Sequence, residues 1–302
     1  MRDDALQGEM ARLRGLVDAA LGRHLSERLE GADGPVPPRL AEAMGYAVLG
    51  GGKRMRPVLT LAACEALGAP AENALPVACA LEMIHAYSLV HDDLPSMDDD
   101  AERRGRPTVH VRYGVATAIL TGDALLTEAF RVVTWPDQPL APDARVRLVA
   151  LVAEAAGASG MVGGQEHDMR AEQEEPSLEL LGSLHAMKTG ALFRASALGG
   201  AIAASATEAQ RAQLERYGRL IGRAFQVTDD LLDFIERRAA PDAQTTGDPH
   251  EDAVNLAVRL GEAACRDEAA RLTAEARAIA ASLGERGWLL DAIAALIEAR
   301  RS

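Results

Sequence analysis

Apolar residues recur at a spacing of three and four positions along almost the whole 302-residue chain, and Gly and Pro interrupt the pattern at intervals. This spacing places apolar side chains on one face of a helix, whereas the alternation typical of strands is rare here. Hydrophobic residues make up 48% of the chain but aromatic residues only 3%. Because the core must then be built from Ala, Leu, Val and Ile, the composition favours helices. The sequence predicts an all-α fold.

The helices are predicted from this spacing, with boundaries that are approximate by a few residues. Their ranges are 4–30, 38–49, 56–67, 73–93, 116–134, 143–161, 177–203, 208–236, 255–283 and 288–301. We find no fixed-period repeat, low-complexity tract or linker between them. The pattern predicts one domain over residues 1–302, a helical bundle with a central substrate cavity.

Charge and apolar run length exclude several classes of protein. The net charge of -13 argues against a nucleic-acid partner, which would favour a basic face. Apolar runs are short, as Glu82 and His85 show by interrupting 74–90, and none approaches the roughly 20 residues of a membrane span. The charged start lacks the apolar segment of a secretory signal. We therefore expect a cytoplasmic protein without a membrane span.

Three cysteines, Cys64, Cys79 and Cys265, show no CxxC spacing and are odd in number. They lie in apolar, helix-like surroundings. This pattern is typical of free buried thiols rather than of a disulfide framework or a zinc site.

The stretch HDDLPSMDDDAERRG holds the first acidic cluster, which includes Asp92, Asp93 and Asp98. A run of charges is ordinarily a solvated face. Here the preceding residues, from Ile84 to Val90, are largely apolar. The cluster is therefore expected at the edge of a core.

A second cluster, in FQVTDDLLDF, places Asp229, Asp230 and Asp233 inside an otherwise apolar helix. Asp229 and Asp233 share a helix face because they are four residues apart. Carboxylates in such surroundings need a cation. Neither cluster has the DxDxDG loop of an EF-hand, whereas a few oxygen ligands on rigid helices suit Mg²⁺ shared with phosphate oxygens. We therefore predict Mg²⁺ at both clusters.

Basic residues gather at separate places along the chain. Lys53, Arg54 and Arg56 follow three glycines in GGGKRMRP, which suits a phosphate group but is no Walker motif. The chain has 30 arginines and only two lysines, Lys53 and Lys188. A nucleotide bias can explain the imbalance, but a compact ammonium also suits pockets too tight for a guanidinium.

Two carboxylate clusters and several basic sites together suit a ligand pair that carries two diphosphates. A diphosphate held through Mg²⁺ can depart as a leaving group, because metal and cations stabilise the charge that develops on it. A bundle lined by small aliphatic residues would shelter a hydrocarbon chain and keep water from a carbocation.

Five segments resemble motifs of the trans-isoprenyl diphosphate synthases, in particular the bacterial farnesyl diphosphate synthases. They are GGKRMRP, HAYSLVHDDLPSMDDDAERRGRPT, GMVGGQ, KTGALFRAS and FQVTDDLLDF, in family order over most of the chain. The resemblance implies an all-α prenyltransferase fold, a homodimer and three Mg²⁺ ions between the two aspartate motifs. It implies that isopentenyl diphosphate adds to the cation of an ionised allylic diphosphate, such as dimethylallyl or geranyl diphosphate, and that a proton is then lost to the departing diphosphate.

The resemblance also implies roles for individual residues. The metal ligands would be Asp92, Asp93, Asp98, Asp229, Asp230 and Asp233. Isopentenyl diphosphate would be bound by Lys53, Arg56, His85 and Arg104, with Arg54 nearby. The allylic diphosphate would be met by Arg103, Lys188, Thr189 and Gln226. Catalysis would rest on Asp92, Asp93, Asp98, Arg103, Lys188 and Asp229. Without the resemblance, His85 reads as an ordinary core histidine.

Product length in this family depends on residues just before the first motif, here Tyr87 and Ser88. The bacterial farnesyl type has an aromatic residue five positions before the first aspartate, as Tyr87 is. A buried ring there would act as a floor that stops growth at C15, although Tyr87 can also be simple core packing.

One departure concerns the segment after the second motif. The family usually carries a Gly-Lys pair there, which contacts the allylic diphosphate, but this chain has no lysine beyond Lys188. The pair is missing between Ala253 and Val254, after a long polar loop over 237–253, and Arg237 or Arg238 could substitute.

Three other functions stay open. A geranylgeranyl diphosphate synthase would differ in product length. A class I terpene cyclase would show a different second metal motif. A non-catalytic subunit would be expected to have lost motif aspartates, and all six are present here.

Overall fold

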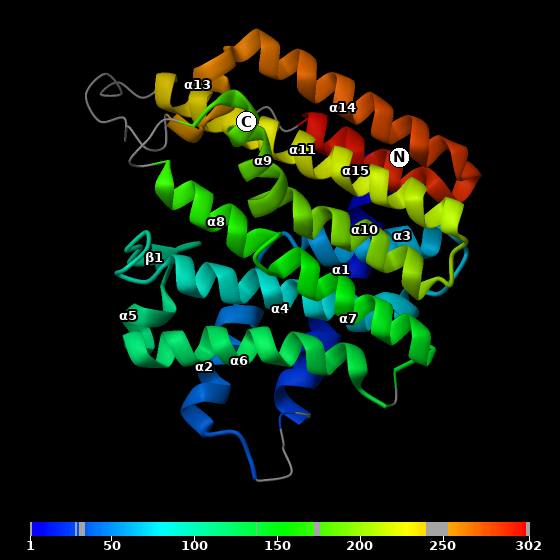
Figure 1. Cartoon of the computed structure of the whole chain (residues 1–302). Coiled ribbons are helices and arrows are strands. Elements are labelled where there is room, and N and C mark those ends of the chain that lie inside the picture. The colour runs from blue at the N-terminus through cyan, green and yellow to red at the C-terminus, as the bar shows by residue number, and fades with distance from the viewer. Residues whose placement is uncertain are drawn as a thin grey trace. The chain divides into compact units, whose positions relative to one another are not determined.

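The structure is a computed structural model that describes residues 2–27, 29, 34–136, 138–171, 176–239 and 253–299. Within these ranges the chain is almost entirely helical, as Figure 1 shows, which confirms the predicted all-α fold. The chain divides into two compact units, and these are described separately. Unit 1 comprises residues 1–61 and 70–152, and unit 2 comprises residues 62–69 and 153–302. That residues 1–302 act as one domain stays a prediction.

Unit 1 carries the first aspartate motif. Its elements are α1 (Arg2–Glu27), α2 (Pro38–Leu49), most of α3 (Met55–Ala66), η1 (Ala71–Ala74), α4 (Leu75–Asp92), β1 (Glu102–Arg103), β2 (Arg106–Pro107), α5 (Val109–Tyr113), α6 (Val115–Thr134) and most of α7 (Pro142–Ala156). Helices α4 and α6 lie side by side over much of their length (Figure 1). The first motif therefore begins at the end of a core helix.

The elements of unit 2 carry the second motif. They are α8 (Met161–Arg170), α9 (Leu178–His185), η2 (Ala186–Gly190), α10 (Ala191–Ala203), α11 (Glu208–Ala239), α13 (Leu256–Leu260), α14 (Glu262–Ser282), η3 (Gly284–Gly287) and α15 (Trp288–Ala299). Figure 1 shows α11, α14 and α15 packed beside one another. The longest of these, α11, holds all three aspartates of the second motif.

The core of unit 1 is built from small and aliphatic side chains, as the composition predicts. In α4, Leu81, Met83 and Ile84 are fully buried, and Leu125 of α6 is buried with them. Full burial of such side chains stabilises a fold by about 1.5–3 kcal/mol each. Helix α4 is mostly apolar and largely buried, and its one carboxylate before Asp92, that of Glu82, is buried. The motif carboxylates can therefore reach solvent only at the end of the helix.

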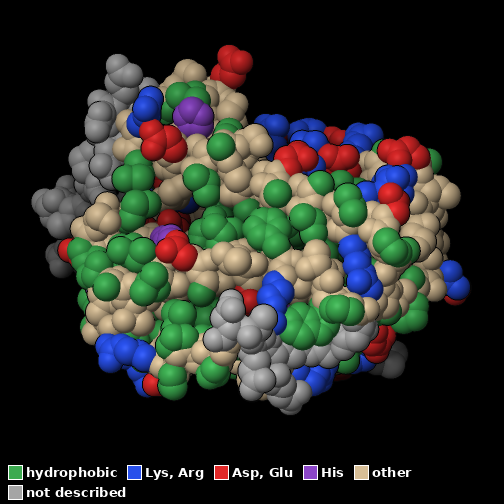
Figure 2. All heavy atoms as spheres, turned by 60° about the horizontal axis from the view of Figure 1, so that its bottom comes forward, with side chains coloured by type: hydrophobic (Ala, Val, Ile, Leu, Met, Phe, Trp, Pro, Cys, Tyr) green, Lys and Arg blue, Asp and Glu red, His purple; other side chains and the backbone are tan. Residues whose placement is uncertain are grey.

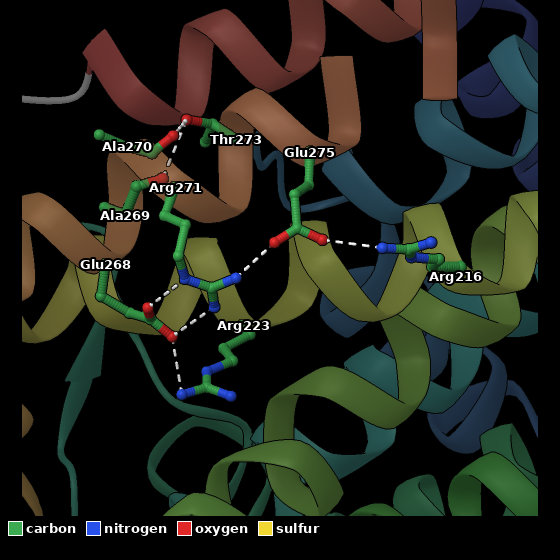
Figure 3. Close-up of polar contacts among 8 residues, drawn as sticks. All are labelled: Arg216, Arg223, Glu268, Ala269, Ala270, Arg271, Thr273 and Glu275. Carbon is green, nitrogen blue, oxygen red and sulfur yellow. Dashed lines mark hydrogen bonds and ion pairs between the residues drawn. The ribbon is translucent and has the colours of Figure 1, made fainter. Parts of the chain in front are cut away.

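Ion pairs cover the outer side of the packing between α11 and α14 in unit 2. Figure 3 shows that Glu268 accepts from both Arg223 and Arg271, and that Glu275 pairs with Arg271 and Arg216. The charges on α14 alternate in sign and α11 contributes the two other arginines, so each charge has an opposite neighbour. The row of pairs keeps solvated charges over the apolar seam beneath it.

The structure corrects several predicted helix boundaries. One helix was predicted over 255–283, but Gly261 has φ of 84° and separates α13 from α14. This left-handed backbone is strained for other residues and ends a helix. Gly114, with φ of 87°, likewise separates the unpredicted helix α5 from α6.

Three further features were absent from the prediction. Residues 161–170 form the separate helix α8, and 177–203 divides into α9, a π-helical turn η2 and α10. Residues 102–107 form a short antiparallel hairpin, in which Arg103 pairs with Arg106.

Two stretches of helix meet the length and hydropathy of a membrane span, contrary to the judgement that no run approached that length. They cover 71–92 and 142–170. In the first, 72% of the most apolar window is buried within the protein, which is the behaviour of a core helix. The second is interrupted between α7 and α8, and 39% of its window is buried. These observations do not establish a membrane span.

Candidate active site

The first aspartate motif lies where α4 ends. Asp92 is the last residue of α4 and Asp93 follows as its C-terminal cap. The chain then turns back, because the Asp98 N–H donates to the Asp92 carbonyl at 2.9 Å. The three aspartates thus share one turn, in which Asp93 is buried, Asp92 part-buried and Asp98 exposed.

Arg103 is tied directly to this motif. Its Nε donates to Asp93 Oδ1 at 2.6 Å, and a second nitrogen reaches Asp100 at 3.2 Å. Burial raises the pKa of Asp93, and the hydrogen bond and charge of Arg103 oppose that rise. The structure thus places a predicted cation against a predicted metal ligand.

The hairpin turn brings Arg104 to the glycine loop. Arg104 and Gly105 have φ of 56° and 72°, which is the backbone of a two-residue hairpin turn. Arg104 donates to the Gly51 carbonyl at 2.7 Å. A Cβ at Gly52 would lie 2.6 Å from an Arg104 nitrogen. The glycine next to Lys53 therefore leaves room for the Arg104 guanidinium.

His85 lies among arginines on the same side of unit 1. Burial lowers its pKa well below 6.5, and the charges of Arg56, Arg104 and Arg103 lower it further. The imidazole is therefore neutral at pH 7, in a region of positive potential that favours an anion.

Arg54, which is expected near the isopentenyl diphosphate site, is bonded to several groups of unit 1. It is buried, and its three nitrogens donate to Asp18 at 2.9 Å, to Glu82 at 2.6 Å and to the Val48 carbonyl at 2.7 Å. Its φ of 51° places it in the left-handed region at the end of the glycine loop. Each of its nitrogens thus has an acceptor within unit 1, and these bonds hold the glycine loop.

The two residues considered for product length lie one turn before the motif. Tyr87 is 5% exposed, and burial together with the charge of Asp92 raises its pKa to about 12. Ser88 donates to the carbonyl of His85 within the helix, at 3.0 Å. Tyr87 is therefore a buried neutral ring, and the Ser88 hydroxyl is occupied by the helix backbone.

In unit 2, Asp230 is buried and holds neighbouring elements together. It accepts from Gln226 at 2.7 Å and from the Leu256 N–H, at the start of α13, at 2.9 Å. Burial raises its pKa to about 7, against these two hydrogen bonds, and the charges of Asp229 and Asp233 raise it further. Asp229 is part-buried and Asp233 is exposed.

Gln226 links the second motif to the π-helical turn. Its carbonyl oxygen accepts from the Thr189 hydroxyl at 2.7 Å while its amide donates to Asp230. The structure therefore joins Thr189, Gln226 and Asp230 in one hydrogen-bonded chain. A single π-turn of this kind often occurs at functional sites.

Lys188 lies in the same π-turn and pairs with Asp168 of α8. A Cβ at Gly164 would lie 2.6 Å from the Cα of Lys188, so α8 approaches this turn closely only because residue 164 is glycine. Asp168 was not identified from the sequence; its place four residues after Gly164, on the same helix face, was the available signal.

His185 was also missed. It donates from Nε2 to the Val254 carbonyl at 3.1 Å, and its Nδ1 lies 4.0 Å from Asp230. Burial lowers its pKa to about 4. It lines a cavity of about 520 Å³ within unit 2, together with Gln226, Val227 and Leu256.

The carboxylates suit Mg²⁺ in donor type, since all are hard oxygen ligands. In the described residues, no group of three or more His, Cys, Asp or Glu side chains stands close enough together to hold a metal alone. A metal here would therefore need oxygen atoms from a ligand as well. The polar loop that precedes the missing Gly-Lys pair lies, at residues 240–252, outside the described residues. Arg238, near the end of α11, lies 5.4 Å from the ring centroid of Phe234.

Known proteins that resemble this chain agree on one family. The family model for polyprenyl synthetase matches residues 37–279. A farnesyl diphosphate synthase of Geobacillus stearothermophilus is 47% identical over 218 residues, which are 72% of this chain and 71% of that protein. A geranylgeranyl diphosphate synthase of Cyanophora paradoxa is 48% identical over 200 residues, 66% of this chain and 67% of that protein.

Solved structures agree with these relatives. The crystal structure of an FPP/GFPP synthase from Zymomonas mobilis has a TM-score of 0.83 and 37% identity, and the match covers 98% of this chain and 99% of that one. The helical architecture, the order of the motifs and the relatives lead to one assignment. The chain belongs to the polyprenyl synthetase family.

Proposed function

We propose that this trans-prenyltransferase condenses isopentenyl diphosphate head to tail with dimethylallyl or geranyl diphosphate and releases farnesyl diphosphate and diphosphate. The observation that carries the proposal is that each aspartate motif is bonded to a group suited to diphosphate: Arg103 to Asp93, and the Thr189–Gln226 chain to Asp230. The farnesyl diphosphate synthases among the relatives support a C15 product.

Mg²⁺ is the metal that this donor set fits, and three ions are proposed for each active site. Bound there, Mg²⁺ would neutralise the charge that develops on the leaving diphosphate. We assign it to the six motif aspartates, Asp92, Asp93, Asp98, Asp229, Asp230 and Asp233. Both oxygens of Asp230 also accept hydrogen bonds, so Asp230 positions Gln226 and the start of α13 as well.

Isopentenyl diphosphate is assigned to Lys53, Arg56, His85 and Arg104. The positive potential around the neutral His85 supports an anion there. Arg54 is assigned to holding the loop that carries Lys53, because its nitrogens are occupied within unit 1.

The allylic diphosphate is assigned to Arg103, Lys188, Thr189 and Gln226. These residues orient the diphosphate and stabilise its charge as the carbon–oxygen bond breaks. The double bond of isopentenyl diphosphate then attacks the allylic carbocation, and the proton released passes to the departing diphosphate. No side-chain nucleophile is required. The apolar interior keeps water from the carbocation.

Tyr87 is proposed as the floor that limits the product to C15. It is a buried ring on α4, five residues before Asp92. A geranylgeranyl diphosphate synthase of similar identity makes C20 the alternative product. Replacing Tyr87 with Ala should then lengthen the product.

A homodimer is proposed from an exposed apolar face of unit 1. Val111, Val115, Ile119 and Leu120 of α5 and α6 are 42–57% exposed, and Val146 of α7 is 70% exposed. Hydrophobic side chains also gather on the face of the molecule that Figure 2 presents. Contiguous apolar surface of this kind marks an interface more often than free surface. A cytoplasmic location and one domain over 1–302 complete the proposal.

The test is incubation of the purified protein with isopentenyl diphosphate, Mg²⁺ and either dimethylallyl or geranyl diphosphate, followed by separation of products by length. We expect C15, lost on addition of EDTA and in Asp92→Ala. Asp143→Ala is the matched control, because Asp143 is an exposed aspartate of α7 that only pairs with Arg147.

A C20 product would support the prenyltransferase activity but refute the role of Tyr87 as the floor that stops growth at C15. Absence of product from either starter, in a folded protein, would contradict the enzyme assignment and favour a non-catalytic subunit.

A further inference from the structure

A glycine of α6 faces the histidine that precedes the first motif. A Cβ at Gly122 would overlap the imidazole of His91, with even Cε1 only 2.7 Å away. Gly122 is buried within α6, where glycine costs a helix about 1 kcal/mol relative to alanine. Alanine would therefore stabilise the helix better than glycine does. Its methyl group would, however, occupy the space that the His91 imidazole fills.

His91 is fixed in that space by two contacts. Its Nε2 donates to the carbonyl of Ile119 in α6, at 3.1 Å. Its ring meets the ring of Tyr87 edge to face, with centroids 5.8 Å apart and planes at 78°. Tyr87 and His91 are four residues apart, so they share one face of α4. The imidazole thus stands between the α6 backbone and the Tyr87 ring.

We propose that Gly122 and His91 are positioning residues for the product-length limit. Because Gly122 has no side chain, the surface of α6 has a notch there, and the His91 imidazole fills this notch. The imidazole in turn holds the Tyr87 ring in the position that closes the pocket. This inference rests on the proposed prenyltransferase and on the role of Tyr87 in it. It assigns no contact with substrate to either residue.

The mechanism predicts that, of two changes that each add one methyl group, only one alters product length. Gly122→Ala forces the imidazole out of the notch and leaves the Tyr87 ring unsupported. Gly45→Ala is the matched control, because Gly45 is also a helical glycine of unit 1 and a Cβ there meets nothing within 4 Å.

The experiment measures the ratio of C20 to C15 product from geranyl and isopentenyl diphosphate with Mg²⁺. We expect Gly122→Ala to raise this ratio roughly tenfold, the effect of about 1.4 kcal/mol on the competition between release and further elongation. Gly45→Ala should leave the ratio unchanged. Melting curves of all variants establish that they are folded.

A double-mutant cycle tests whether the effect passes through His91. His91→Ala removes the imidazole and should itself raise the ratio. In that background Gly122→Ala has no ring to displace, so the double variant should match His91→Ala. An equal further increase in the double variant would show that Gly122 acts without His91, and would overturn the proposal.

Other outcomes separate this inference from the proposed function. If the wild type makes C15 and neither Gly122→Ala nor His91→Ala changes the ratio, the inference is wrong and the function stands. If Gly122→Ala does not fold, His91→Ala decides alone, since it creates no overlap. If the wild type makes no prenyl diphosphate, the proposed function fails first, and the inference fails with it.

Discussion

The guanidinium of Arg54 donates to the carboxylate of Glu82 at 2.6 Å, and both side chains are buried. The motif GGGKRMRP thus contains an arginine with a structural role. Its neighbour Lys53 is exposed. Adjacent basic residues in one motif therefore have different tasks, which their spacing alone does not distinguish.

Arg54→Met should destabilise the fold. Removing one partner of a buried ion pair leaves the other charge uncompensated, at a cost of about 3–5 kcal/mol. The free energy of unfolding in urea measures this, with Arg147→Met on the exposed face of α7 as control. The double variant Arg54→Met/Glu82→Leu should recover part of the loss. A stable Arg54→Met protein with a raised KM for isopentenyl diphosphate would instead restore the direct substrate role.

Lys188→Arg should reduce kcat/KM for the allylic diphosphate by roughly tenfold or more while leaving the melting temperature nearly unchanged. The larger guanidinium has to fit a turn that lies against Gly164 and opposite Asp168. Steady-state kinetics with varied geranyl diphosphate measure the effect. Full activity of Lys188→Arg would show that the rarity of lysine here has no functional cause.

His85 should make the stability depend on pH below its ordinary pKa. Burial and the charges of four arginines lower its pKa in the folded state, so the unfolded chain binds the extra proton first. Its contribution is therefore fully present above pH 6.5 and is lost as the pH falls below 6.5, by up to about 1.4 kcal/mol per unit. His85→Gln should flatten the dependence of urea unfolding on pH between 6.5 and 5. An unchanged slope would contradict the neutral histidine.

Glu268 should stabilise the packing of α11 and α14 in a salt-dependent way. It accepts from Arg271 and Arg223 (Figure 3), and the hydrogen bond of Arg271 lowers its pKa. Its contribution is present above its ordinary pKa and is lost as the pH falls through the lowered value.

Glu268→Gln should accordingly lower the urea midpoint at low salt and neutral pH. The difference should shrink in 1 M NaCl, where the Debye length is about 3 Å. Glu179→Gln provides a control, because Glu179 is exposed on α9. A difference that persists at high salt would assign Glu268 a packing role instead.

The sequence predicts the helices that have a clear apolar period, such as α2 over Pro38–Leu49, at their observed bounds. It fails where backbone geometry interrupts the period. Gly261 divides a predicted helix through its positive φ, and the hairpin turn at Arg104 follows no apolar pattern. Short elements of this kind carry too few apolar residues to be detected by periodicity.

Apolar period and motif spacing are local properties of the chain, and they were enough to predict the helical fold and the family. Which charges neutralise one another depends on how the helices pack. Arg54 pairs with Glu82, 28 residues away, and Lys188 pairs with Asp168 where Gly164 lets two elements approach. The importance of the missing side chain at Gly122 likewise becomes visible only when α6 packs against His91. Such pairings depend on which side chains the packing of helices brings within a few ångströms, and no local pattern records that.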